Sequence, residues 1–124
     1  MFDDSKFPLI EMEQIEALAR LIGKLYKPEQ VILFGSYAEG RPHGHSDVDL
    51  CIIKQTELPP IERGYELRKL LRPYRQQFVF PKDIAVYTPQ EFNALKQYSN
   101  SFENTIWLTG KILYARPNLT SVLV

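Results

Sequence analysis

The sequence predicts an α/β (α+β) fold in which helices flank a small mixed β-sheet. Three short apolar runs, at residues 31–34, 48–53 and 84–87, have the length of buried strands and are bounded by turn-forming or charged residues. Segments with helical periodicity or helix-capping residues lie around these runs. The resulting order, helix–strand–helix–strand–helix–strand–helix, is typical of an α/β domain.

The first half of the chain opens with an amphipathic helix at residues 10–26, which Pro28 ends. A buried strand follows at 31–34. Residues 35–46 hold three glycines and a proline, so we expect a loop with a short helical turn near its start. The strand at 48–53 comes next.

The helix in the middle of the chain opens at Pro59 and Pro60 and ends near Pro73. Its predicted apolar positions are Ile61, Tyr65, Leu67, Leu70, Leu71 and Tyr74.

The last third begins with the strand at 84–87. Residues 88–91, Thr-Pro-Gln-Glu, form a capping box with proline at the first helical position, so a helix begins there. Another helix spans 101–109, with Gly110 where a C-terminal cap belongs. Residues 112–114 add a short strand.

Length and composition favour one soluble domain. At 124 residues, 44% hydrophobic and 24% charged, the chain has room for one core. We expect a single domain over residues 1–124, with the N-terminal helix at 10–26, core strands and a helix at 31–88, and C-terminal helices with a short strand at 89–124. A chain this short buries roughly two-thirds of its unfolded surface, so partner binding could matter to its stability.

The charge balance argues against direct binding of nucleic acid. The formal net charge is 0, whereas a protein that binds polyanions is expected to have a basic surplus. Basic residues nevertheless gather at 61–82, which is either a solvated helix face or a surface facing phosphate or a partner. The stretch holds Arg63, Arg68, Lys69, Arg72, Arg75 and Lys82 against Glu62 and Glu66.

Cysteine usage and hydropathy indicate a cytoplasmic protein. Cys51 is the only cysteine and lies in an apolar run, which favours a buried, inert thiol and excludes an internal disulfide. No segment approaches 18 consecutive apolar residues, and the acidic N-terminus is unlike a signal peptide. We expect no contact with a membrane.

Two carboxylates, Asp47 and Asp49, stand at the start of the second strand. Residues two apart on a strand share a face, with Cα atoms about 6.5–7 Å apart. The two charges repel each other unless a cation lies nearby, and Mg²⁺ prefers one or two carboxylates together with phosphate oxygens and water. The alternative is a solvent-exposed strand start at which acidic residues cap or turn the chain.

Asp83 precedes the third strand in the same way. If that strand lies beside the second, an interstrand spacing of about 4.8 Å brings three carboxylates into one cluster. If the strands are not neighbours, Asp83 merely ends the turn at Pro81. The expectation of a metal site therefore depends on the order of the strands.

Gly35-Ser36 directly follows the first strand. Glycine lets the backbone approach a ligand closely, and exposed N–H groups with the Ser36 hydroxyl can hold phosphate oxygens. The alternative is ordinary turn chemistry. The segment is neither a Walker loop nor a GxGxxG loop.

Gly35-Ser36, ten intervening residues and then Asp47-Val48-Asp49 resemble the GS-x10-DxD signature of the DNA polymerase β-like nucleotidyltransferases. The run GSYAEGRPHGHSDVDL is similar to the version found in minimal nucleotidyltransferases (MNT proteins). The resemblance continues at residues 82–86, which match the strand bearing the family's third carboxylate, and at 110–114. It covers about residues 30–115 and implies the nucleotidyltransferase fold.

The resemblance also implies roles for the three aspartates. Asp47 and Asp49 would hold two Mg²⁺ ions that bridge the triphosphate of ATP, and Asp83 would ligate the second ion and help to deprotonate the acceptor hydroxyl. The reaction would transfer AMP with release of pyrophosphate.

Further nucleotide-binding candidates lie in the same loop. Gly35 and Ser36 would hold the outer phosphates, and Arg41 and Ser46 are additional candidates. Many relatives have arginine where this chain has Glu39, so a phosphate-contacting cation is missing there unless Arg41 replaces it. His43 and His45 are either ligands or, as is commoner for loop histidines, solvated.

The chain resembles those MNT proteins that act as antitoxins and silence a HEPN-domain ribonuclease toxin by transferring AMP to it. This resemblance implies a protein adenylyltransferase with a HEPN toxin as partner. The basic helix at 61–75 and the aromatic residues Phe102, Trp107 and Tyr114 are candidate contact surfaces, unless the aromatics are core. The alternatives are adenylylation of a small molecule, as in aminoglycoside nucleotidyltransferases, and an antitoxin that inhibits by binding without chemistry.

Overall fold

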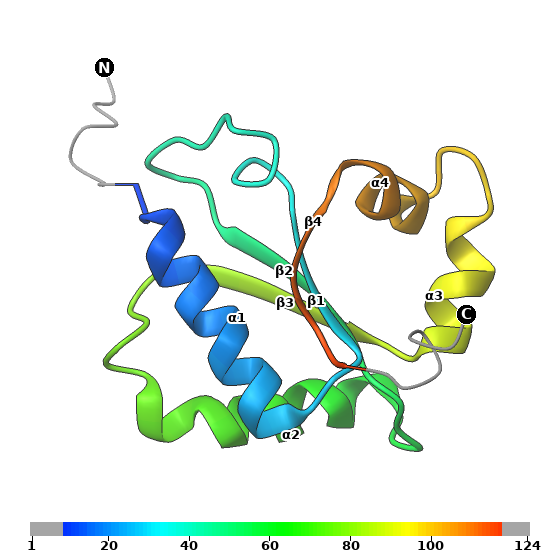
Figure 1. Cartoon of the computed structure of the whole chain (residues 1–124), viewed down its shortest axis with the longest axis horizontal. Helices are drawn as coiled ribbons and strands as arrows, with labels where there is room; N and C mark the ends of the chain where they lie inside the picture. The colour runs from blue at the N-terminus through cyan, green and yellow to red at the C-terminus, as the bar shows by residue number, and fades with distance from the viewer. Residues whose placement is uncertain (1–8, 118–124) are drawn as a thin grey trace.

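The computed structural model describes residues 9–117, and the end of the predicted C-terminal segment at 89–124 lies outside them. The elements, in chain order, are α1 (Met12–Tyr26), β1 (Gln30–Phe34), β2 (Val48–Ile53), α2 (Pro60–Leu71), the 3₁₀ turn η2 (Arg72–Tyr74), β3 (Lys82–Tyr87), α3 (Pro89–Lys96), α4 (Phe102–Thr109) and β4 (Lys111–Ala115). The predicted α/β class with helices around a small sheet is confirmed (Figure 1).

The sheet is mixed, with the strand order β3-β2-β1-β4. β2 pairs with β3 in parallel, whereas β1 pairs with both β2 and β4 in antiparallel fashion. β3 and β4 are therefore the two edge strands. Helices α1 and α2 lie on one side of the strands, and α3 and α4 lie on the other (Figure 1).

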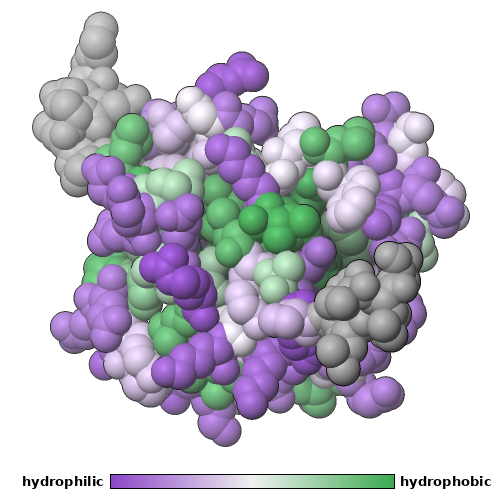
Figure 2. All heavy atoms as spheres, in the orientation of Figure 1, coloured by the Kyte–Doolittle hydropathy of each residue, from purple (hydrophilic) through white to green (hydrophobic). Residues whose placement is uncertain are grey.

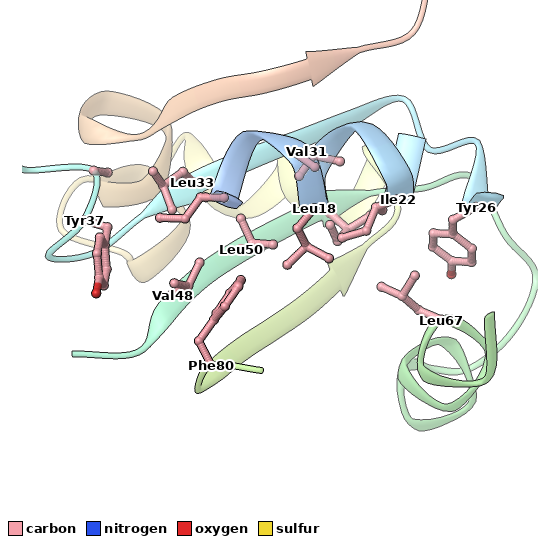
Figure 3. Packing of buried hydrophobic residues seen from close by; sticks show 14 residues of the cluster. Leu18, Ile22, Tyr26, Val31, Leu33, Tyr37, Val48, Leu50, Leu67 and Phe80 are labelled. Carbon is pink, nitrogen blue, oxygen red and sulfur yellow. The ribbon is translucent and has the colours of Figure 1, made fainter. Parts of the chain in front are cut away.

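The larger core lies between the sheet and α1. Alternate residues of each strand point to it because side chains along a strand alternate between faces. Leu18 of α1, Leu50 of β2 and Leu67 of α2 belong to this one cluster and are at most 1% exposed (Figure 3). The predicted amphipathic character of the first helix is confirmed. Of its predicted apolar positions Leu25 is only partly buried, and the others are buried: Ile15, Leu18, Ala19, Ile22 and Tyr26.

A smaller core lies on the opposite face, under α3 and α4. It consists of Ile32, Cys51 and Ile53 from the strands, with Phe92 and Ile106 from the helices. Burial raises the pKa of the Cys51 thiol to about 12. The expectation of a buried, inert cysteine is therefore confirmed.

The sequence correctly predicts where α3 and α4 begin. The capping box at the start of α3 is present, with the Thr88 N–H donating to Glu91 Oε1 at 2.9 Å. Ser101 caps α4, and Gly110 follows the last residue of that helix. The reason for glycine differs from the prediction, since Gly110 has φ −76°, which any residue adopts. A Cβ there would instead lie 2.5 Å from the Ile106 carbonyl oxygen, so close packing requires glycine.

Between β1 and β2 the expected short helical turn is present, with the Glu39 N–H donating to the Gly35 oxygen at 3.0 Å, and loop follows it. It is a single turn and not a helix of the predicted element order. The expectation for the middle helix is wrong in part. On α2, the predicted apolar positions Ile61 and Tyr65 are 86% and 56% exposed, whereas Arg63 is only 5% exposed.

The burial of Arg63 follows from its partners. Its guanidinium donates to both carboxylate oxygens of Glu91, at 2.7 and 3.0 Å, and to the Leu58 carbonyl oxygen at 2.7 Å. A buried cation needs such partners because leaving water unpaired is unfavourable. Arg63 therefore joins α2 to α3 and is not part of an exposed basic surface.

No helix within residues 9–117 is both long and apolar enough to cross a membrane. That the whole chain, residues 1–124, forms one domain stays a prediction.

Candidate active site

The parallel pairing of β2 with β3 places Asp49 opposite Asp83 in register. Registered partners in a sheet point to the same face. Their neighbours Leu50 and Ile84 face α1, so the two aspartates lie on the α3–α4 face. The second and third strands are therefore neighbours, as the predicted metal site requires. Asp83 does not precede its strand but lies within it, because β3 begins at Lys82.

An open cavity of about 400 Å³ is lined by both carboxylates and lies beside the end of β1. Two loop residues and one face of α4 complete its wall. It is lined by Phe34, Gly35, Glu39, Asp49, Asp83, Phe102, Thr105, Ile106 and Thr109. The sheet thus supplies acidic groups on one side of the cavity, and α4 supplies hydroxyl and aromatic groups on the other.

The electrostatics of the site disfavour an ionised Asp49 in the absence of a cation. Burial raises the pKa of the Asp49 carboxyl, and the negative charges of Asp83 and Asp47 raise it further. Asp47 precedes β2 and is exposed, while Asp49 is half-buried. The charges of both other aspartates therefore act on Asp49, although only Asp49 and Asp83 line the cavity.

These carboxylates do not form a complete metal cage. Within residues 9–117 no group of three or more His, Cys, Asp or Glu side chains is arranged to hold a metal ion. The expected single cluster of three aspartates is therefore not preformed, because Asp47 lies in the loop before the strand. Asp49 and Asp83 nevertheless suit Mg²⁺, which takes one or two carboxylates and completes its shell with phosphate oxygens and water.

Gly35 fits tightly against Asp49. Its φ is +76°, and a Cβ built on it would overlap the Asp49 carboxylate. Gly40 has nearly the same φ, +75°, but a Cβ there would meet nothing within 4 Å. Position 35 thus requires glycine both for its backbone conformation and for the space that Asp49 occupies.

The other predicted nucleotide-binding residues do not line this cavity. The Ser36 carbonyl oxygen accepts a hydrogen bond from the Arg41 N–H at 2.9 Å, and the Arg41 side chain is exposed. The Ser46 hydroxyl accepts from the His43 N–H at 2.9 Å and so closes a turn in the loop. Their contacts with nucleotide stay predictions.

Glu39 lines the cavity at the position where the family resemblance implies an arginine. Arg41 does not replace it there, so the cavity wall holds three carboxylates and no basic side chain. His43 and His45 are exposed in the loop outside the cavity, and ligand roles for them stay predictions.

Sequence reasoning missed the contribution of α4. The sequence predicts a partner contact or a core position for Phe102, and it gives no role to Thr105 or Thr109. Phe102 packs edge-on against Phe34 with ring centroids 5.4 Å apart, and Ile106 anchors the helix in the smaller core. No local signal gives this placement, because it results from packing between elements distant in sequence.

The chain matches the model of the nucleotidyltransferase domain family over residues 12–108. No curated protein matches it significantly. Among solved structures it is similar to a candidate nucleotidyltransferase from Sulfolobus solfataricus, with 16% identity, 85% of this chain and 83% of that chain covered, and a TM-score of 0.57.

Two further similar structures come from toxin–antitoxin complexes. One complex contains AMP-PNP, and the match has 20% identity, a TM-score of 0.51, and covers 88% of this chain and 78% of that chain. The other is a mutant MntA-HpeT complex, with 18% identity, the same coverage of 88% and 78%, and a TM-score of 0.50. At these identities the three similarities show a shared fold.

Proposed function

Because the chain belongs to the nucleotidyltransferase domain family, we propose that it transfers AMP from ATP to a hydroxyl group on a partner protein. The observation that carries this proposal is the alignment of Asp49 with Asp83 across β2 and β3, beside Gly35. Two carboxylates on one sheet face, next to a glycine turn that packs against one of them, suit a magnesium nucleotide.

In the proposed reaction the acceptor oxygen bonds to the α-phosphorus, the bond from that phosphorus to the β-bridging oxygen breaks, and pyrophosphate leaves. Bound Mg²⁺, with two ions in our proposal, would supply neutralisation of the developing negative charge. Asp47 and Asp49 would hold the metal that binds the triphosphate, and Asp83 would bind the second ion and take up the acceptor proton. The exposed position of Asp83 supports access by an acceptor.

The nucleotide would enter the cavity between the sheet and α4. Gly35 and Ser36 would bind the outer phosphates through backbone N–H groups, with Arg41 and Ser46 reaching the nucleotide from the loop. Phe102 offers an exposed aromatic face and Thr105 a hydroxyl on the opposite wall.

We propose a HEPN-domain toxin as the partner, so that the chain acts as an antitoxin by adenylylating it. The similarity in fold to chains of two toxin–antitoxin complexes supports this choice. So does the exposed apolar surface, because Leu108 and Ile112 are 71% and 52% exposed, and large apolar patches mark interaction sites. Figure 2 shows apolar side chains gathered near the centre of the viewed face, ringed by hydrophilic ones.

Glu39 favours one alternative, an antitoxin that inhibits by binding alone. A third carboxylate in the cavity repels the triphosphate unless metal neutralises it. Metal-dependent release of pyrophosphate on adding the partner separates the two functions, because binding alone releases none. Small-molecule adenylylation would give transfer with no protein acceptor present.

The test combines the purified chain and its HEPN partner with α-labelled ATP and Mg²⁺. The expected result is label on the partner and an increase in its intact mass by one or more AMP units. Asp47→Asn is expected to keep the fold, as judged by circular dichroism, and to abolish labelling. Retained transfer in that variant would refute the roles of the aspartates.

A further inference from the structure

A second hollow, of about 500 Å³, lies on the other face of the sheet between α2, η2 and the start of β3. Its floor is apolar and includes Leu18 and Leu67, both 1% exposed. Its rim carries Arg68, Arg72 and Arg75. We call this hollow the arginine groove.

The three arginines form one row. Arg68 and Arg72 are four residues apart and Arg75 follows three later, so successive turns of α2 and η2 project them on one side. The Arg68 guanidinium lies over the preceding turn of α2, because a Cβ at Gly64 would be in ordinary contact with Arg68 Nη1 at 3.5 Å. The row therefore lies along the groove.

None of these three arginines is in an ion pair within residues 9–117, where the ion pairs are Arg63–Glu91 and Arg116–Glu29. Like charges one helical turn apart destabilise a helix. Three exposed guanidinium groups over an apolar floor thus match a ligand that has both carboxylates and an apolar side chain. A nucleic acid fits less well, because its interfaces are polar and strongly charged, whereas this floor is apolar and the chain has a net charge of 0.

The groove meets the nucleotide cavity at Asp83, which lines both. Asp83 can be reached from either face because β3 is an edge strand. Its negative charge repels carboxylates at this end of the groove. An acidic segment lying along the arginines would therefore present an uncharged side chain, such as one with a hydroxyl, to Asp83.

We propose that the arginine groove binds an acidic, amphipathic segment of the partner protein and directs the acceptor hydroxyl of that segment to Asp83. The acceptor role of the segment rests on the proposed nucleotidyl transfer. Binding of the segment to the groove does not depend on that reaction and can be measured without turnover.

The test is fluorescence anisotropy with a short labelled peptide in which glutamates flank a leucine and a tyrosine. Arg68→Glu combined with Arg72→Glu is expected to weaken its binding by roughly tenfold or more. The matched control, Arg20→Glu combined with Lys69→Glu, makes the same change in charge at exposed positions outside the groove and is expected to bind like wild type. Circular dichroism checks that both double variants fold.

The inference is overturned if the peptide does not bind, if its glutamine analogue binds equally well, or if both double variants bind alike. It is also overturned if a labelled oligouridylate binds more tightly than the peptide and loses affinity in the groove variant, since the groove would then bind RNA.

Asp49→Asn separates this inference from the proposed function. The variant is expected to bind the peptide like wild type but to transfer no label from α-labelled ATP. If wild type binds the peptide through the arginines yet labels neither the peptide nor a protein partner, the groove stands and the proposed function fails.

Discussion

The two faces of the sheet are built from the same strands but differ in composition. Towards α1 every inward position of β1 and β2 is apolar and buried, and the cluster extends into α2. Towards α3 and α4 the buried positions are fewer, and at the start of β2 and β3 carboxylates replace apolar residues. Neighbouring residues such as Asp49 and Leu50 therefore face opposite environments.

The two faces of the sheet therefore differ in what they contribute to the protein. The α1 face supplies most of the apolar burial, which stabilises the fold. The α4 face keeps an unfavourable arrangement, in which burial and neighbouring charges raise the pKa of Asp49. Such strained carboxylates are typical of functional sites, where a ligand relieves the repulsion.

The largest expected effect is on activity at position 49. Asp49→Asn removes a proposed metal ligand while keeping the side-chain volume, so transfer of label from α-labelled ATP should fall by about a thousandfold. The control is Leu50→Ala, assayed at a temperature where it is folded, which should keep activity. Equal losses in the two variants would show that the faces are not functionally distinct.

The variants Asp49→Asn and Leu50→Ala should also differ in stability, and here Leu50→Ala should be the more damaging of the two. Leu50→Ala opens a cavity in the larger core and should lower the free energy of unfolding by about 2–5 kcal/mol. Asp49→Asn should raise it at neutral pH, because ionised Asp49 destabilises the fold above its raised pKa. As pH falls through that pKa the penalty disappears, so the two proteins should converge toward about pH 4. Urea titrations at several pH values measure this, and a destabilised Asp49→Asn would contradict it.

Arg63 joins α2 on one side of the sheet to α3 on the other, and its removal should have an intermediate effect on stability. Arg63→Met leaves Glu91 without its partner and should lower stability by about 2 kcal/mol at neutral pH, since Glu91 is 40% exposed and can hydrate. Hydrogen bonding to Arg63 lowers the pKa of Glu91, so the stabilisation is present above the unfolded pKa and lost as pH falls through the folded one. The wild type should therefore lose more stability on acidification than the variant, and parallel pH profiles would refute the pairing.

The smallest effect compares two glycines. Gly35→Ala and Gly40→Ala both place a side chain at positive φ, which costs about 1 kcal/mol. Only Gly35→Ala also forces a Cβ against Asp49, so it should be less stable than Gly40→Ala by about a further 1 kcal/mol. Thermal unfolding of the two variants tests this, and identical midpoints would argue against the close contact.

Elements with local signals could be predicted from sequence, whereas tertiary placements could not. The apolar run of β2 and the capping box at Thr88 act within a few residues, and both were located correctly. Arg63 was assigned to an exposed face because its burial depends on Glu91, 28 residues away. Likewise, no pattern within α4 indicates that it closes the cavity over Asp49.

The pairing of Asp49 with Asp83 lies between these cases. Each aspartate was found from its place beside an apolar run, and the family resemblance linked them. The strand order β3-β2-β1-β4 that brings them together involves non-local contacts, which sequence periodicity does not encode. Asp47 shows the limit of this reasoning, because it lies outside β2 and does not complete a cluster.

The most direct test of whether β2 and β3 together form one cation site is electron paramagnetic resonance of Mn²⁺. The ion is titrated with AMP-PNP into wild type, Asp49→Asn and Asp83→Asn. If the aligned carboxylates share the ion, wild type should bind Mn²⁺ in the presence of the nucleotide, and each single variant should bind it much more weakly. Undiminished binding in Asp83→Asn, with its fold intact, would contradict the site and the proposed chemistry with it.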